Sequence, residues 1–383
     1  MRHFHKFLTS IEYFVIISLI LFLTFFKTIK STIGISLNLI RSAGGLPDKN
    51  TLIESQKFPG YDAYRYCIPK KRQKTYSSSK DLCITPIFNF ENNFALNLFS
   101  IRKSGCAATI VILSDDTTSF SQDTENLISL FKVKICKGIF KGESMLKRHV
   151  DFMRDTLCYE LLKFIYRKMK ENVASYDRVF FFDSFDVYFE KDPFRYFEKK
   201  DVVYFFQEAD VKLADSSFNA DGVSGCFGID GLESIKDKPV ICSGTMGAGS
   251  VASFLKFLKY FVHLKCFQDS RCPYDQGALI YVIHANLLKK KKINYFVFPP
   301  DGPVAACKIG PINIVNKKTK KGKEYLQIYS LNNNHKYEVV HQYTSIQQIL
   351  DGFTEKTHFN EYIKDHKDEI QNNEANTIIL SIS

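Results

Sequence analysis

The chain has 383 residues, of which 45% are hydrophobic and 24% charged, so it can bury a sizeable core and has the composition of a globular protein. Its formal net charge is +11, but the lysines gather in short runs such as residues 289–292. A nucleic-acid-binding surface would gather this charge on one face with interleaved aromatic residues, so the sequence argues against a nucleic-acid partner.

The N-terminal region contains a nearly unbroken apolar run at residues 7–26. About 20 apolar residues suffice to cross a bilayer as a helix. Basic residues flank the run on both sides, so the positive-inside rule does not fix its orientation. Phe25, Phe26 and Lys27 occupy the place of a small-residue cleavage site, which favours a signal-anchor over a cleaved signal peptide. We expect a short tail and an anchor helix within residues 1–30.

All ten cysteines follow this segment. An even number of cysteines beyond an anchor permits disulfides, with Cys226–Cys242 and Cys266–Cys272 as local pairs, although spacing leaves the connectivity open. No C-x-x-C pair and no Cys/His ladder occurs, so no structural zinc site is expected.

Residues 31–80 are rich in turn formers and predict a stem or linker. The folded domain is expected at residues 81–354. Periodicity predicts strands at 82–89, 109–113, 131–136, 179–182, 202–206 and 337–340, and helices at 93–104, 144–170 and 253–264. This alternation is typical of an α/β fold, with a Rossmann-like, mainly parallel sheet flanked by helices. Residues 355–383 are expected to be a tail of low order, apart from a possible short helix.

The main chemical signal is the segment R-V-F-F-F-D-S-F-D-V-Y-F-E-K-D-P-F at residues 178–194. Its apolar run places Asp183 at the carboxyl end of a buried strand, the edge where open α/β sheets bind ligands. Asp186 follows after the chain has begun to turn. Two carboxylates this close repel unless a cation lies between them, and Mn²⁺ or Mg²⁺ accepts such ligands. The alternative is that the acids only cap a turn. A haloacid-dehalogenase phosphatase would separate its acids by one residue, whereas two intervene here.

This segment resembles the acidic metal motif of nucleotide-diphospho-sugar transferases of the GT-A fold. Its D-S-F-D-V is similar to the D-S-Y-D-V of the glycosyltransferase domain of procollagen lysyl hydroxylases. Four further segments resemble elements of that group, between about residue 81 and residue 344. They are F-F-Q-E at 205–208, C-S-G-T-M-G-A-G at 242–249, Y-D-Q at 274–276 and V-V-H-Q at 339–342.

The resemblance implies a GT-A-like fold and transfer of a sugar from a nucleotide-diphosphate donor, UDP-hexose by default, to a protein, lipid or glycan acceptor. It implies Asp183, Asp186 and His341 as ligands of Mn²⁺ or Mg²⁺. With the anchor, it implies a single-pass protein of the endoplasmic reticulum or Golgi with a luminal catalytic domain. Cys242 and Tyr274 depart from the family's Asn and Asp. They leave open a non-catalytic, membrane-tethered sugar- or nucleotide-binding protein on a degenerate transferase fold.

The other candidates each have a structural alternative. The glycines of residues 243–249 let backbone amides approach a ligand or form a tight turn. Asp275 is a natural N-cap or contacts the sugar, and Arg154 is solvated or holds the diphosphate or the aspartate pair. His341 is a third ligand or a structural histidine. We expect Asp275 and Glu208 in catalysis, and Asp115, Arg154, Ser243, Gly244, Gly247 and Gln276 at the donor.

Overall fold

The computed structural model describes residues 75–88, 94–140, 150–264, 266, 275–318, 324–346, 349 and 376–382. The predicted anchor within residues 1–30 lies outside these ranges, as does the predicted linker up to residue 74. Among the helices that are described, none is long and apolar enough to cross a bilayer.

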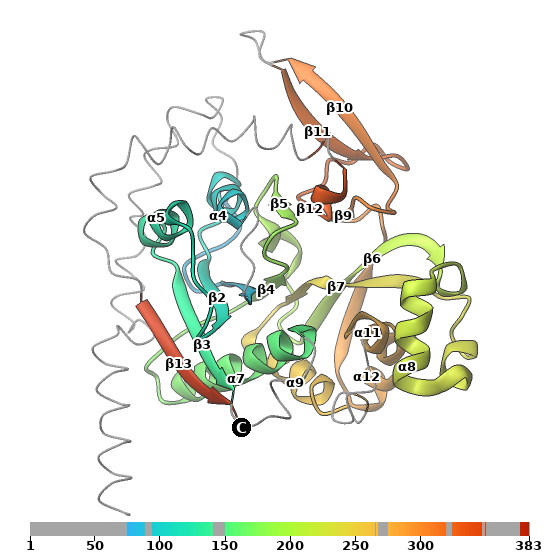
Figure 1. Ribbon diagram of the computed structural model, residues 1–383, viewed down its shortest axis with the longest axis horizontal. Coiled ribbons are helices and arrows are strands. Elements are labelled where there is room, and N and C mark those ends of the chain that lie inside the picture. Colours follow the sequence, from blue (N-terminus) through green and yellow to red (C-terminus); the bar gives the residue numbers. More distant parts are fainter. Residues whose placement is uncertain are drawn as a thin grey trace, which may run out of the picture. The chain divides into compact units, whose positions relative to one another are not determined.

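An eight-stranded sheet forms the centre of the fold, in the order β13-β3-β2-β1-β4-β7-β6-β8 (Figure 1). The first five strands in this order run parallel to one another, and β6 is parallel to β8. Strand β7 is antiparallel to both β4 and β6. The strands are β1 Leu82–Ile87, β2 Thr109–Asp115, β3 Lys134–Phe140, β4 Val179–Phe182, β6 Val202–Lys212, β7 Pro239–Ala248, β8 Asn294–Phe298 and β13 Asn376–Ile382.

Helices cover both faces of this sheet. Helices α7, α9 and α11 pack on one face, and α4 and α5 pack on the other. The helices are α4 Phe94–Lys103, α5 Gln122–Leu130, α7 Val150–Lys170, α8 Ser217–Glu233, α9 Val251–Phe261, α11 Asp275–His284 and α12 Leu287–Lys290. The prediction of an α/β fold with a mainly parallel sheet flanked by helices is therefore confirmed.

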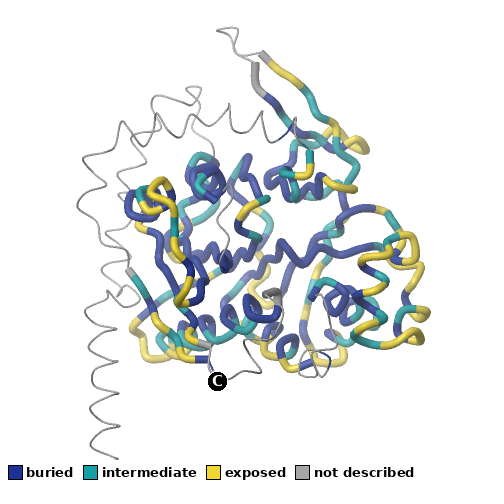
Figure 2. Tube along the Cα trace, in the orientation of Figure 1, coloured by how far each residue is buried: buried dark blue, intermediate teal, exposed yellow. Residues whose placement is uncertain are grey.

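Strand β4 is apolar at every position because it is buried on both faces. Phe181 packs with the α7 and α9 side, whereas Phe180 and Phe182 belong to the aromatic cluster on the α4 side. Figure 2 shows the central strands buried along most of their length, while exposed residues collect on α8 and in loops. The doubly covered strand leads directly into the acidic segment.

A second, three-stranded sheet follows that segment, in the order β5-β12-β9. Its strands are β5 Val187–Phe189, β9 Val304–Ala306 and β12 Val339–His341, with β12 antiparallel to β5 and parallel to β9. Strands β10 Ile312–Lys318 and β11 Glu324–Ser330 form an antiparallel hairpin. The short 3₁₀ helices are η1 Pro193–Tyr196, η2 Leu213–Asp215 and η3 Tyr343–Ser345. The chain thus passes from the large sheet to the small one across the two aspartates.

Strand β13 corrects the expectation of a C-terminal tail of low order. Residues Asn376–Ile382 pair in parallel with β3 at the edge of the large sheet. Ile378 and Ile382 are buried in the α7-side core, whereas Ile379 is 52% exposed. This alternation buries one side of the strand, and the pairing satisfies its backbone groups. For residues 376–382 the expectation was wrong because it considered only local sequence, whereas residues 355–375 lie outside the described ranges.

Candidate metal centre

The acidic segment begins where β4 ends. The backbone N–H of Asp183 donates to the carbonyl of Gly244 at 2.8 Å, which continues the pairing with β7 by one residue. The side-chain amide of Asn97 donates to the carbonyls of Asp183 at 3.4 Å and Val187 at 3.1 Å. These bonds hold both ends of the turn that carries Asp186.

Asp183, Asp186 and His341 come together as predicted, with one potential ligand atom of each residue within 4.8 Å of the others. His341 Nε2 lies 3.5 Å from an Oδ of Asp183 and 3.5 Å from an Oδ of Asp186. The histidine ends β12 and is 3% exposed, while the two aspartates are half-buried. Residues from two different sheets therefore meet at one point.

The electrostatics of this cluster fit a bound cation. Burial by itself would lower the pKa of His341, but Cys242 and the two carboxylates together raise it well above its usual value. Burial acts to raise the pKa of Asp183, yet Arg154 and His341 outweigh it and the pKa is lowered. Oδ1 of Asp186 is buried and accepts no hydrogen bond among the described residues. The cluster thus offers two carboxylates and an imidazole, and the Asp186 Oδ1 has no hydrogen bond within the described part of the chain. This is a suitable set of ligand atoms for a divalent metal.

Arg154 of α7 links two of the predicted acids. Its guanidinium contacts Asp183 at 2.5 Å and forms a second ion pair with Asp275. It also donates to the Ser243 carbonyl at 3.3 Å, and its side chain is only 8% exposed. Arg154 is thus buried rather than solvated, and of the predicted aspartate pair it contacts Asp183, together with Asp275.

Asp275 is the first residue of α11 and is buried beside the metal cluster. It accepts a hydrogen bond from the Ser243 hydroxyl at 3.2 Å, in addition to its ion pair with Arg154. Gln276 accepts from the Ser243 backbone N–H at 3.4 Å. The serine of the glycine segment and the two residues of the Y-D-Q segment therefore form one continuous network.

Glu208 joins this network from β6. Burial raises its pKa, with partial opposition from His341 and Gln276. Its carboxylate accepts from the side-chain amides of Gln276 at 3.3 Å and Gln342 at 3.4 Å. Glu208 lies within β6 rather than at its end, since that strand continues to Lys212.

Three contributing residues were not among the predicted ones. Asn97 fastens the acidic turn, Gln342 binds Glu208, and Asn219 of α8 accepts from Gln276 at 2.9 Å. Gln342 follows His341 directly, so its position in the V-V-H-Q segment could have indicated it. Asn97 and Asn219 lie in helices without any motif.

The segment at residues 243–249 is not the expected tight turn. It lies mostly within β7, which is paired on both sides. A Cβ on Gly247 would approach the Phe197 ring to 2.5 Å, so this glycine makes room for the aromatic core. Gly247 thus has a packing reason of its own, and no contact joins it to the metal cluster in the described part of the chain.

Gly244 faces the cluster itself. A Cβ there would overlap the Asp183 carboxylate and lie 2.6 Å from Cε1 and 2.7 Å from Nε2 of His341. We expect Gly244→Ala to push these ligands apart and to weaken Mn²⁺ binding by about 10–100-fold, as other changes around metal ligands do. Mn²⁺ titration monitored by electron paramagnetic resonance measures this, and circular dichroism checks the fold. Unchanged affinity in a folded variant would contradict the predicted geometry.

Asp115 is not brought to the cluster by any contact among the described residues. It ends β2, and its carboxylate accepts from the Thr117 hydroxyl at 3.0 Å and from the Thr118 backbone N–H at 2.8 Å. Asp115 therefore closes the turn after its strand. A contact with the donor nucleotide remains a prediction for this residue.

The local disulfide pairs expected from spacing do not form. Cys226 is disulfide-bonded, but Cys242 is a thiol that contacts His341. Cys266 is likewise a thiol rather than half of a disulfide. Proximity along the chain was misleading because Cys242 lies in the central strand β7.

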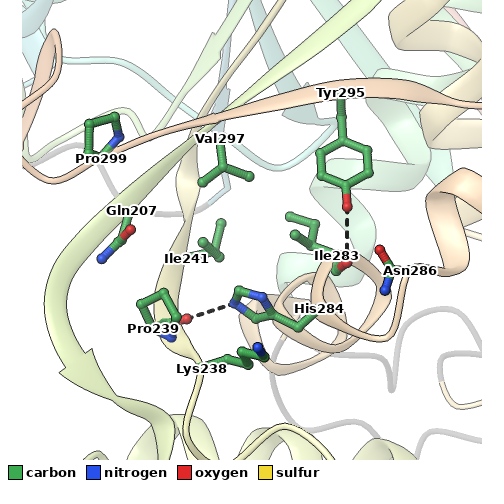
Figure 3. A pocket seen from close by; sticks show the side chains of 10 residues that line it. All are labelled: Gln207, Lys238, Pro239, Ile241, Ile283, His284, Asn286, Tyr295, Val297 and Pro299. Atoms are coloured by element: carbon green, nitrogen blue, oxygen red, sulfur yellow. Dashed lines mark hydrogen bonds between the residues drawn. The ribbon is translucent and has the colours of Figure 1, made fainter.

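A cavity of about 400 Å³ lies away from the predicted residues, between α11 and the strands β6, β7 and β8 (Figure 3). Several of its polar groups already have protein partners. His284 hydrogen bonds with the Pro239 carbonyl at 2.9 Å, and the Tyr295 hydroxyl donates to the Ile283 carbonyl at 3.2 Å. The cavity contains none of the clustered acids.

Comparison with known proteins leaves the family open. No family model matches the chain, and no curated protein matches it. One solved structure, described as "Crystal Structure of a Mycobacterial Protein", is 12% identical and covers 68% of this chain and 86% of that one, with a TM-score of 0.27. A similarity of this degree assigns neither a family nor an activity.

Proposed function

We propose that this protein is a metal-dependent glycosyltransferase of GT-A-like fold that uses a nucleotide-diphosphate sugar. The observation that carries the proposal is the meeting of Asp183, Asp186 and His341 at the carboxyl end of β4. Ligands bind at this edge in open α/β sheets. UDP-hexose as donor, and a protein, lipid or glycan as acceptor, follow from the resemblance of the motifs.

Asp183, Asp186 and His341 would hold Mn²⁺ or Mg²⁺. When bound, such an ion would neutralise the negative charge that develops on the diphosphate leaving group. The protein's own contribution is to fix Asp183 and the turn that carries Asp186, through the carbonyl of Gly244, the amide of Asn97 and the guanidinium of Arg154. This arrangement is preorganised, so little has to move when the ligands are engaged.

The Ser243, Asp275 and Gln276 network lies beside the ligands and is suited to hold sugar hydroxyls. Glu208 is the candidate for activating the acceptor hydroxyl, because burial raises its pKa and a more basic carboxylate takes a proton more readily. Gln276 and Gln342 fix its orientation through their amides. Catalysis would rest on positioning and charge stabilisation rather than on a protein nucleophile.

The protein would be anchored in a membrane of the secretory pathway by its N-terminal apolar segment. The disulfide at Cys226 fits an oxidising compartment, since disulfides are rare in the cytosol, whereas seven other described cysteines are thiols. The catalytic domain would then lie in the lumen.

The direct test is release of UDP by the full-length chain incubated with several UDP-hexoses and Mn²⁺. We expect UDP release with at least one donor, its loss when a chelator removes the metal, and its return when excess Mn²⁺ is added. Donor binding without UDP release would favour the non-catalytic binding protein. Phosphate release from simple esters, without activity on UDP-sugars, would favour a metal-dependent phosphatase instead.

A further inference from the structure

Cys242 lies directly behind the predicted histidine ligand. Its sulfur is 3.2 Å from Nδ1 of His341, while Nε2 of the same ring faces Asp183 and Asp186. Cys242 is only 2% exposed, so water does not compete for this contact. The imidazole is thus held between a thiol on one side and two carboxylates on the other.

A histidine that binds a metal through one nitrogen carries a hydrogen on the other, and that hydrogen needs an acceptor. The acceptor is commonly a carboxylate or a backbone carbonyl. Here the group at hydrogen-bond distance from Nδ1 is a sulfur, which is a weaker acceptor.

In a second hydrogen bond of Cys242, the sulfur is again the acceptor. The Thr245 hydroxyl donates to the Cys242 sulfur at 3.5 Å. The sulfur lone pairs of Cys242 can thus serve as the acceptor for both Thr245 and His341.

We propose that Cys242 is the positioning residue of the metal centre: its sulfur accepts the Nδ1–H of His341 and thereby holds the ring with Nε2 turned toward the two aspartates. This inference rests on the metal centre of the proposed function.

The test compares Mn²⁺ dissociation constants of the full-length chain with those of Cys242→Ala, Cys242→Asn and Cys136→Ala, measured by electron paramagnetic resonance. Cys136 is an equally buried thiol in β3 and serves as the matched control. We expect Cys242→Ala to weaken Mn²⁺ binding by about 10–100-fold. Cys242→Asn should restore most of the affinity because its carbonyl oxygen accepts the same hydrogen, and Cys136→Ala should bind as the unaltered chain does.

A second measurement separates this inference from the metal assignment. Nitrogen-15 NMR of the metal-free protein should show a hydrogen-bonded Nδ1–H of His341 that is lost in Cys242→Ala and regained in Cys242→Asn. Absence of Mn²⁺ binding in the unaltered chain would overturn the metal centre, and the NMR result would then decide the role of Cys242 alone. Equal Mn²⁺ affinity of Cys242→Ala, or identical His341 spectra, would overturn the role of Cys242.

Discussion

Replacement of Asp186 by alanine is expected to abolish donor turnover while the fold survives. Asp186 contributes a buried oxygen that accepts no hydrogen bond among the described residues and lies 3.5 Å from Nε2 of His341, so the main internal loss is one ion-pair contact. The free energy of unfolding without metal should therefore change by only about 1 kcal/mol. A metal ion contributes several kcal/mol of charge stabilisation, so UDP release should fall about 1,000-fold.

The same variant has a signature that does not depend on turnover. Saturating Mn²⁺ should raise the melting temperature of the unaltered chain, because a ligand that binds only the native state stabilises it. This increase should disappear in Asp186→Ala. Asp237→Ala is the control, since the Asp237 side chain is 71% exposed and lies on the surface in an ion pair with Lys212. Retained turnover and a retained thermal shift in Asp186→Ala would together contradict the metal centre.

Among the proposed substitutions, replacement of Arg154 by methionine is expected to lower the free energy of unfolding the most. Its guanidinium neutralises Asp183 and Asp275 at once and packs 5.6 Å from the centre of the Phe181 ring. Methionine fills similar space but leaves both carboxylates without this cation. Removal of one partner from a buried ion pair costs about 3–5 kcal/mol, and the free energy of unfolding should fall by that amount.

Chemical denaturation of Arg154→Met and Arg167→Met measures this difference on one helix. Arg167 is exposed on α7, so its replacement should change stability by less than about 0.5 kcal/mol. Arg154→Lys should recover only part of the loss, because a single ammonium does not bridge two carboxylates as a guanidinium does. If Arg154→Met is as stable as Arg167→Met, the bridge has no structural role.

The sequence predicted the acidic half of the site through local physics. Four apolar residues before Asp183 indicate a strand covered on both faces, and its end is where β4 ends in the structure. His341 was reached through the resemblance alone, since a histidine after a short strand has no local signature. The strand that ends before Asp183 was predicted best, because its burial can be recognised from neighbouring residues in the sequence.

The errors arose where distant residues determine conformation. Gly244 and Gly247 suggested a turn, but both lie in β7. They are glycines because neighbouring side chains fill the space that a Cβ would need: Asp183 and His341 at Gly244, and Phe197 at Gly247. Strand β13 was missed because its partner β3 is far away in the sequence. The contact between Cys242 and His341 likewise joins β7 to β12 and could not be read from spacing.

The position of β13 has a consequence for how the protein is handled and made. Without residues 376–382, β3 would become the outermost strand and present a row of unpaired backbone groups, a template for aggregation. An affinity tag is therefore better placed elsewhere than directly against this strand. On the ribosome, β3 therefore remains the edge strand until translation has passed Ile382.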